Sequence, residues 1–296
     1  MADKIKPSLK GIIIAMSLSL ISSQAQAEIV SVKSMKDVKT KVEGLLHSQN
    51  PEEVLVAFDI DMTLTQPDHP AVYYPALIKY VEIYKKIMSS LSPEQKDLVS
   101  TLTTQEVPQK LVEQETQRII KALQAQGVKT MALTSVLAGN IKGFKEKMVT
   151  LRRDQLQEMG IDFTKSFKNF CRVMTFSTFQ FYAEGHPLFY HGILSTNGEG
   201  AASKGDVLVA FLKHVGSHHE GKALKPGYYP KIVVFIDDKK KHLENVKAAL
   251  KAYNPSIQFL GIEYKGAYAY APQSISQEAF EAFWQGLAIQ AKKHEH

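Results

Sequence analysis

Residues 54–58, Val-Leu-Val-Ala-Phe, form an apolar run that ends directly in Asp59 and Asp61. Apolar runs of about four to eight residues that are rich in β-branched side chains are typical of parallel strands buried on both faces. Open sheets of such strands place their ligands at the carboxyl ends of the strands. The run therefore predicts a buried strand of an α/β sheet, with both aspartates at the edge where a site forms.

Two further apolar runs end in polar side chains in the same way. They are residues 128–135, which end in Thr134 and Ser135, and residues 231–238, which end in Asp237 and Asp238. A fourth apolar run covers residues 257–262. Because the carboxyl ends of parallel strands meet at one edge of a sheet, we expect these polar side chains to lie close together.

Segments with helical periodicity separate the strand-like runs. Apolar residues recur at helical spacing in residues 35–49, 77–91, 109–126 and 204–212, and from about Ser274 onward. Ser92-Pro93-Glu94-Gln95 supplies an N-cap, a first-turn proline and a capping-box glutamine, and Gly127 stands at a C-cap position. The alternation of helices and strands predicts a doubly wound parallel sheet, with Lys204 reaching the same edge from a helix start.

Residues 173–196 have a different pattern. Two runs with alternating aromatic residues flank Gly185-His186-Pro187. This arrangement predicts a β-hairpin excursion, either at an edge of the sheet without a part in the chemistry or over the site.

The N-terminus predicts export. Lys4, Lys6 and Lys10 precede an apolar stretch, residues 11–21, that is too short to span a bilayer comfortably, and Ala25-Gln26-Ala27 is a small-x-small cleavage site. We therefore expect residues 1–27 to be a signal peptide and the mature protein to be periplasmic or secreted, without a stable membrane anchor after cleavage. An uncleaved membrane anchor is the alternative.

The charge and the cysteine content restrict the class of protein. The 296 residues carry a formal net charge of +6, and the first 27 residues hold three lysines and one aspartate, so the mature chain is only mildly basic. Such a charge is compatible with an anionic substrate but falls short of a nucleic-acid-binding surface, and we expect no nucleic-acid partner. Cys171 is the single cysteine, which excludes an intrachain disulfide.

The Asp-x-Asp pair has simpler interpretations. Aspartate and threonine are common wherever a strand ends in a turn. A calcium loop would use Asp59, Asp61 and Thr63 at its first, third and fifth positions. The sixth position, however, would be Leu64 in place of the glycine that the turn requires, and the twelfth would be Pro70 in place of glutamate. The pattern therefore excludes the calcium loop and leaves a turn or a catalytic pair.

Over residues 54–262 the chain resembles the haloacid dehalogenase-like (HAD) superfamily. The motifs that carry the resemblance are Asp59-Ile60-Asp61-Met62-Thr63-Leu64-Thr65, Leu133-Thr134-Ser135, Lys204-Gly205 and Ile236-Asp237-Asp238. In that superfamily the first aspartate attacks phosphorus, and an aspartate two residues later marks the phosphatases. The resemblance implies a Rossmann-like core, a required Mg²⁺ ion and a cap domain.

The residue types assign roles within this chemistry. We expect Asp59 to be the nucleophile and Asp61 the general acid and base, with Thr134 and Lys204 holding phosphoryl oxygens. Thr63 and Ser135 are expected to bind substrate, Ser135 being an alternative to Thr134. The expected metal ligands are Asp59, a backbone carbonyl near Asp61 and Asp237. Asp238 is expected either to support these ligands without touching the ion or to bind the ion through a water molecule, with Glu244 and Asn245 available to orient it.

These assignments divide the chain into a signal peptide (1–27), an α/β core (28–65 and 109–296) and a helical cap (66–108). A cap that closes over the site favours a small soluble phosphate ester over a macromolecule. Four tyrosines, Tyr73, Tyr74, Tyr80 and Tyr84, either stack on a nucleobase or form the apolar core of the cap. The expected function is an exported Mg²⁺-dependent phosphatase. A phosphotransferase and a non-catalytic phosphoryl-binding protein are the alternatives, and the sequence sets no oligomeric state.

Overall fold

The computed structural model describes residues 28–139, 147–167, 173–200, 202–216, 228–269 and 274–293. The expected signal peptide, residues 1–27, lies outside these residues and stays a prediction, and Cys171 also lies outside them. In the described part of the chain, none of the helices has the length and apolar character that crossing a bilayer requires.

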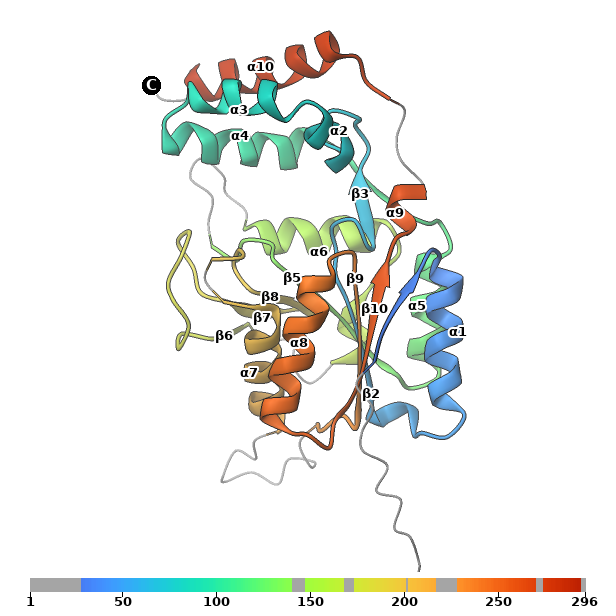
Figure 1. Ribbon diagram of the computed structural model, residues 1–296. Coiled ribbons are helices and arrows are strands. Elements are labelled where there is room, and N and C mark those ends of the chain that lie inside the picture. Colours follow the sequence, from blue (N-terminus) through green and yellow to red (C-terminus); the bar gives the residue numbers. More distant parts are fainter. Residues whose placement is uncertain are drawn as a thin grey trace, which may run out of the picture.

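The centre of the molecule is an eight-stranded sheet (Figure 1). In spatial order its strands are β1 (Glu28–Val32), β10 (Gln258–Tyr264), β9 (Ile232–Asp237), β2 (Val54–Phe58), β5 (Lys129–Thr134), β8 (Ile193–Ser195), β7 (Leu188–Tyr190) and β6 (Met174–Thr175). The strands from β1 across to β8 are parallel, and β7 and β6 add antiparallel pairings at one edge. The buried strands predicted from the apolar runs are confirmed.

Alternate residues of the central strand point to opposite faces of the sheet. Val54, Val56 and Phe58 belong to one apolar cluster, whereas Leu55 and Ala57 belong to the other. Both faces are covered by helices: α1 (Met35–Leu46), α5 (Thr116–Ala125) and α6 (Met148–Glu158) on the first, and α7 (Lys204–Gly216) and α8 (Lys240–Tyr253) on the second. The protein thus has a mixed α/β fold with a large, mostly parallel central sheet flanked by helices, consistent with a Rossmann-like fold.

Three local details differ from the sequence expectations. Residues 109–111 form the short strand β4 (Gln109–Leu111), and α5 begins only at Thr116, because β4 pairs antiparallel with β3 (Thr65–Pro67). Strand β1 was not predicted; only one of its five residues is buried, so it lacks a continuous apolar pattern. Helix α6 was also missed, since its buried face includes an arginine.

The aromatic segment forms the antiparallel edge of the sheet. A tight turn at His191 and Gly192, both with positive φ, joins β7 to β8, and a longer loop joins β6 to β7. The predicted hairpin is therefore present at a sheet edge. Its turn lies later in the chain than Gly185-His186-Pro187, which belongs to the longer loop.

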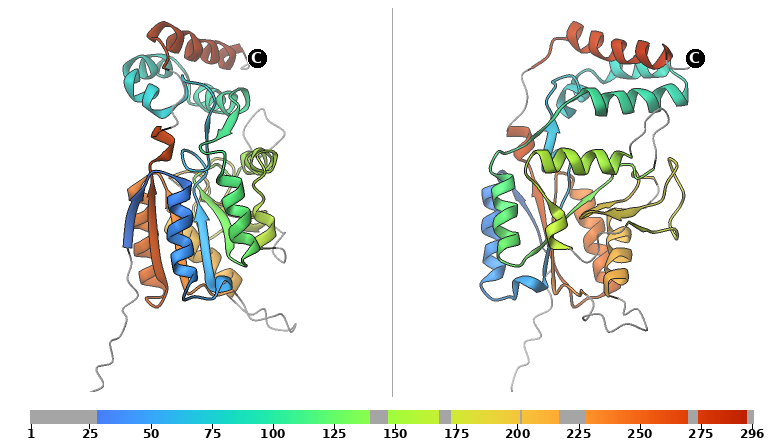
Figure 2. Two further views of the ribbon diagram at one scale, coloured as in Figure 1. Left: turned by 90° about the vertical axis from the view of Figure 1, so that its right-hand side faces the viewer. Right: turned by 180° about the vertical axis from the view of Figure 1, so that it is seen from behind.

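Four helices form a second layer beyond the carboxyl ends of the central strands (Figure 2). We call this layer the helical unit; it consists of α2 (Tyr74–Lys79), α3 (Val81–Ser89), α4 (Pro93–Glu106) and α10 (Gln277–Lys293). Helix α4 begins with the predicted capping box at Ser92 and Gln95. The antiparallel pair β3–β4 carries the chain out of the sheet and back into the core.

The helical unit is larger than the expected cap. Phe280, Trp284 and Leu287 of α10 share an apolar cluster with Ile87 of α3 and Val99 of α4. The sequence pattern correctly identified the apolar stripe of α10. It assigned this helix to the core (residues 109–296), whereas in the structure the helix packs against α3 and α4. The terminal helix α10 packs on α3 and α4 because it shields their apolar stripes from solvent.

Candidate functional site

Three neighbouring strands bring polar groups to one edge of the sheet. Strand β2 lies between β5 and β9, so Asp59, Thr134 and Asp237 come to adjacent positions at the three strand ends. The amide of Asp59 donates to the carbonyl of Ile236 at 2.8 Å, which extends the pairing of β2 with β9 by one residue. The predicted convergence of these residues is therefore observed.

A cavity of about 340 Å³ opens at this edge. The residues that line it are Asp59, Asp61, Met62, Tyr74, Thr134, Ser135, Glu199, Lys204, Asp238, Lys239, His242 and Tyr268. Six of the expected site residues are among them. Asp237 lies directly beneath, and Thr63 does not line the cavity.

Lys204 is the central cation of the site. Its Nζ lies 2.7 Å from Asp59 Oδ1 and 2.7 Å from Asp237 Oδ2, and its side chain is only 2% exposed. Burial by itself lowers the pKa of a lysine, but the two carboxylates outweigh burial and raise the pKa of Lys204. The ammonium group is therefore retained and holds the two aspartates in fixed positions.

Asp59 is surrounded by more groups that oppose its negative charge than groups that stabilise it. Burial raises the pKa of Asp59 well above its usual value, and the neighbouring Asp237 and Asp61 raise it further against the opposing effect of Lys204. Lys204 is shared between Asp59 and Asp237, so its charge offsets that of Asp59 only in part. The site therefore favours additional positive charge near Asp59.

Asp237 has both carboxylate oxygens engaged. Besides Lys204, it lies 3.0 and 3.2 Å from His242 Nδ1 and accepts the amide of Lys239 at 2.8 Å. Although burial raises the pKa of Asp237, Lys204 and His242 together outweigh burial and lower it. Asp237 is a fully buried anion that positions Lys204 and His242.

Asp238, the next residue, lines the cavity itself. Burial and the adjacent Asp237 raise the pKa of Asp238 to about 6. The residues expected to orient Asp238 have other partners. Asn245 accepts the amide of Gly205 at 2.8 Å, which fixes the start of α7 beside Lys204, and Glu244 lies 3.8 Å from Lys240.

Glu199, Lys239 and His242 line the cavity and were not predicted. Glu199 accepts from Lys239 Nζ at 3.1 Å and lies 3.6 Å from His242 Nε2, so His242 bridges Glu199 and Asp237. His242 and Lys239 follow the aspartate pair within one helical turn, which is a local signal that sequence reasoning could have used. Glu199 comes from the loop after β8, and no local pattern points to it.

Asp61 stands on a sharp turn that follows β2. Met62 has a positive φ of 63°, and its amide donates to the carbonyl of Thr65 at 2.7 Å. This turn directs the carboxyl of Asp61 into the open, where its side chain is 48% exposed. Thr63, on the inner side of the turn, is fully buried, so its expected contact with substrate is not supported by its position.

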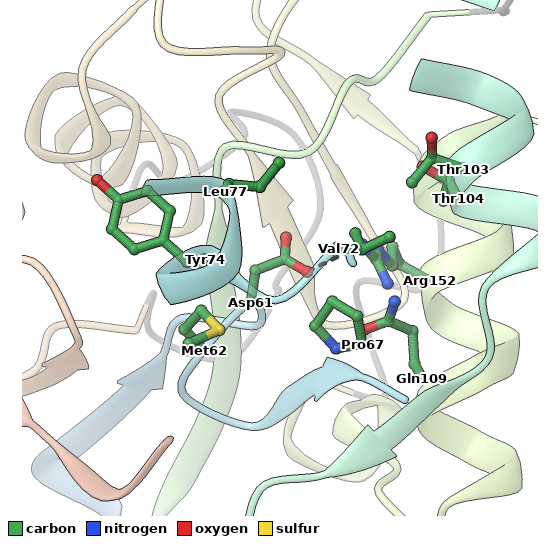
Figure 3. Close-up of a pocket in the computed structure, with 10 residues that line it drawn as sticks. All are labelled: Asp61, Met62, Pro67, Val72, Tyr74, Leu77, Thr103, Thr104, Gln109 and Arg152. Carbon is green, nitrogen blue, oxygen red and sulfur yellow. Dashed lines mark hydrogen bonds and ion pairs between the residues drawn. The ribbon is translucent and has the colours of Figure 1, made fainter. Parts of the chain in front are cut away.

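Arg152 of α6 pairs with Asp61. Its Nη2 lies 2.9 Å from Asp61 Oδ1 (Figure 3), and its Nη1 donates to Gln155 at 3.1 Å. The arginine side chain is 9% exposed. Asp61 and Arg152 are 91 positions apart in the sequence, so this pair could not be predicted from either segment alone.

Comparison with known proteins assigns the chain to a family. Residues 31–292 match the family described as "Protein of unknown function (DUF2608)", and the chain belongs to it. It is 20% identical over 259 residues to an uncharacterised protein of Rickettsia bellii, covering 83% of this chain and 80% of the relative. An uncharacterised protein of Rickettsia felis is 23% identical over 259 residues with the same coverage. The family match covers the sheet from the last two residues of β1 onward and the helical unit up to the penultimate residue of α10.

Proposed function

We propose that this member of the DUF2608 family is an exported, Mg²⁺-dependent phosphatase of the HAD type that hydrolyses small phosphate monoesters. The observation that carries the proposal is the position of Lys204, bonded at 2.7 Å to both Asp59 and Asp237 in the cavity that Thr134 and Ser135 also line. A nucleophile, a cation and two hydroxyls around one space are the groups that phosphoryl transfer requires.

The arrangement of the sheet supports this assignment. The four sequence motifs that resemble the HAD superfamily come from β2, β5, α7 and β9, and all four deliver side chains to one edge. Helices α2, α3 and α4 of the helical unit are inserted where that superfamily places a cap, between β2 and β5, and α10 joins them from the end of the chain. Fold and motifs are thus mutually consistent.

The residues present fit a Mg²⁺ ion. Mg²⁺ prefers hard oxygen ligands in an octahedral arrangement. Asp59, Asp238 and a backbone carbonyl near Asp61 would hold the ion at the cavity. Asp237 lies below the cavity surface, and the ion would compete with Lys204 and His242 for the Asp237 carboxylate. The observation that favours a bound cation is the grouping of Asp59, Asp237 and His242, whose ligand atoms all lie within 4.8 Å of one another. When bound, the ion would offset negative charge on the phosphate.

The chain's own groups account for the reaction steps. The Asp59 carboxylate attacks phosphorus and forms an acyl phosphate while the bond to the ester oxygen breaks. Lys204 and the Thr134 hydroxyl hold phosphoryl oxygens; Thr134 Oγ1 accepts the amide of Val136 at 3.3 Å, which leaves its proton for donation. Asp61 gives a proton to the departing alkoxide and then removes one from the water that hydrolyses the acyl phosphate.

The test is a screen of the mature chain, residues 28–296, against a panel of phosphate monoesters with Mg²⁺, with released phosphate as the readout. Asp59→Asn is the matched control, because the amide has the same shape but is a poor nucleophile. We expect phosphate release by the wild-type protein only. Equal release by both proteins, or none from any ester, would remove the proposal. Addition of an alcohol acceptor then separates hydrolysis from phosphoryl transfer.

A further inference from the structure

A second cavity, of about 220 Å³, lies beside the first (Figure 3). It is lined by Asp61, Met62, Pro67, Val72, Tyr74, Leu77, Thr103, Thr104, Gln109 and Arg152. These residues come from the turn after β2, the β3–β4 pair, the helical unit and α6, so the cavity lies between the helical unit and the core. Its volume is below the ~300–1,000 Å³ of typical ligand pockets, which favours an occupant of few carbon atoms.

Asp61 forms a wall common to both cavities, together with Met62 and Tyr74. If the proposed function holds, the phosphoryl group occupies the first cavity next to Asp59. A general acid must lie within hydrogen-bonding distance of the ester oxygen that departs from the phosphoryl group. The second cavity, on the other side of Asp61, is therefore the space available to the leaving group.

Two lining residues carry polar atoms that are buried and have no hydrogen-bond partner among the described residues. They are Nε of Arg152 and Oε1 of Gln109. The other Arg152 contacts are to Asp61 through Nη2 and to Gln155 through Nη1. Each of these atoms has less than 1 Å² of accessible surface, so a ligand would reach it only with a small rotation of the side chain. Buried polar groups are nearly always satisfied, and an unpaired donor and an unpaired acceptor beside one cavity are evidence for a ligand that supplies the complementary groups.

The chemistry of the lining identifies the class of ligand. Arginine has a planar set of five donors that matches a carboxylate, and a carboxylate oxygen is the strongest acceptor that a small alcohol can offer it. Oε1 of Gln109 accepts, so it suits a hydroxyl group. Pro67, Val72 and Leu77 supply an apolar surface for the carbon chain between the two.

We propose that the second cavity is a leaving-group subsite for the phosphate ester of a small hydroxy acid, in which Arg152 binds the carboxylate and Gln109 accepts a hydroxyl. The proposal rests on the phosphatase assignment for the position of the phosphoryl group. Arg152 is then a specificity-determining residue, in addition to its contact with Asp61.

The test uses a matched pair of esters, 3-phosphoglycerate and glycerol 1-phosphate. The first carries a carboxylate where the second carries a hydroxymethyl group. Charged hydrogen bonds to a carboxylate predict a kcat/KM ratio of about 10 to 100 in favour of 3-phosphoglycerate. Arg152→Gln should bring this ratio close to one. If Arg152 only orients Asp61, the variant lowers kcat/KM for both esters equally and the ratio is unchanged, which would overturn the proposal.

Arg153→Gln is the matched control, because Arg153 pairs with Asp154 and donates to Tyr190, and it does not line the cavity. This variant should keep the wild-type ratio.

Gln109→Leu provides an independent variant should Arg152→Gln fail to fold. It should weaken the binding of 3-phosphoglycerate, because the hydroxyl loses its acceptor, and unchanged binding would contradict the role of Gln109.

Binding to Asp59→Asn, measured calorimetrically with Mg²⁺, separates the two proposals. If the variant binds inorganic phosphate but the wild-type protein hydrolyses none of the esters, the phosphatase proposal is rejected and the subsite proposal is not. Tighter binding of 3-phosphoglycerate than of glycerol 1-phosphate, lost with Arg152→Gln, would still support the subsite. Equal affinity for the two esters would reject the subsite, whatever the outcome of the phosphatase screen.

Discussion

The sheet and the helical unit are stabilised in different ways. Every residue of β2 and β9 is buried, and these strands take hydrogen bonds from neighbours on both sides. In the helical unit, α2 has no buried residue and α3 has one, Ile87. The sheet therefore positions the charged groups rigidly, whereas the helical unit holds together through a narrow apolar seam that α10 completes.

Tyrosine side chains join the helical unit to the core at one point and otherwise pack within the helical unit itself. The Tyr73 hydroxyl donates to the carbonyl of Ala267 at 2.7 Å, and Tyr80 donates to that of Ile275 at 2.9 Å. Tyr80 and Tyr84 pack against Phe280 and Trp284, with ring centroids 4.9 and 4.8 Å apart. Of the four tyrosines predicted either to stack on substrate or to form the cap core, these three are structural.

Tyr74 is the exception among the four. It is 49% exposed and lines both cavities. The helical unit thus contributes a wall to the site but none of the charged groups in it. This division predicts that changes in the core abolish chemistry, while changes in the helical unit alter stability and selectivity.

Metal removal should have the largest effect on the proposed activity. Metal ions supply several kcal/mol of charge stabilisation in such reactions, so EDTA should reduce phosphate release by at least ~10³-fold and excess Mg²⁺ should restore it. Mg²⁺ should also raise the Tm of the wild-type protein, because a ligand that binds only the folded state stabilises it. Full activity after complete metal depletion would show that the acidic cluster serves another purpose.

Asp61→Asn should have the next largest effect. General acid and base groups contribute about 10²–10⁴-fold, so steady-state turnover should fall by that factor. An aryl phosphate needs little protonation of its leaving group, so the first half-reaction persists while the second lacks its base. The variant should therefore accumulate phosphate on Asp59, measured as a mass increase on the peptide that carries it. Unchanged turnover on both alkyl and aryl esters would make Asp61 a structural residue.

Trp284→Ala tests the seam of the helical unit. Trp284 is 4% exposed, and its Nε1 donates to the carbonyl of Ala71 at 3.1 Å. Removal of a buried tryptophan typically costs about 3–5 kcal/mol. We expect faster amide exchange in residues 74–106, measured by mass spectrometry, with β9 still protected.

Ile289→Ala is the control on the same helix, because Ile289 is 53% exposed. Surface substitutions of this kind usually change stability by less than about 0.5 kcal/mol. A global loss of protection in Trp284→Ala, including β9, would show that the two regions unfold as one and that the contrast between them is wrong.

Ser92→Ala should have the smallest effect. Ser92 accepts the amide of Gln95 at 3.2 Å, and Gln95 accepts the amide of Ser92 at 3.0 Å, which completes the capping box of α4. Loss of an N-cap costs about 1 kcal/mol, so the free energy of unfolding measured with urea should fall by that amount. Ser100→Ala, within the same helix, should leave it unchanged or slightly higher, because alanine is the better helix former. Equal losses in both variants would refute the role of the cap.

The sequence determined the core and most of the site, because those signals are local. An apolar run buried on both faces specifies a strand, and the residues that directly follow the strand must lie at its carboxyl end. Asp59, Thr134 and Asp237 were therefore predictable from their own segments. Lys204 was predictable for the same reason, as the first residue of a helix that follows a loop.

Only the tertiary structure decided which distant segments meet. Arg152 reaches Asp61 across 91 positions, and α10 covers α3 and α4 from the other end of the chain. An amphipathic stripe states that a helix must be covered but not by what, since many apolar surfaces satisfy the same periodicity. The buried Arg152 in α6 interrupts the apolar periodicity by which a helix is recognised, because its partner, Asp61, lies on another segment. The local pattern thus set the chemistry of the strand ends, and long-range packing set the second cavity and the groups that line it.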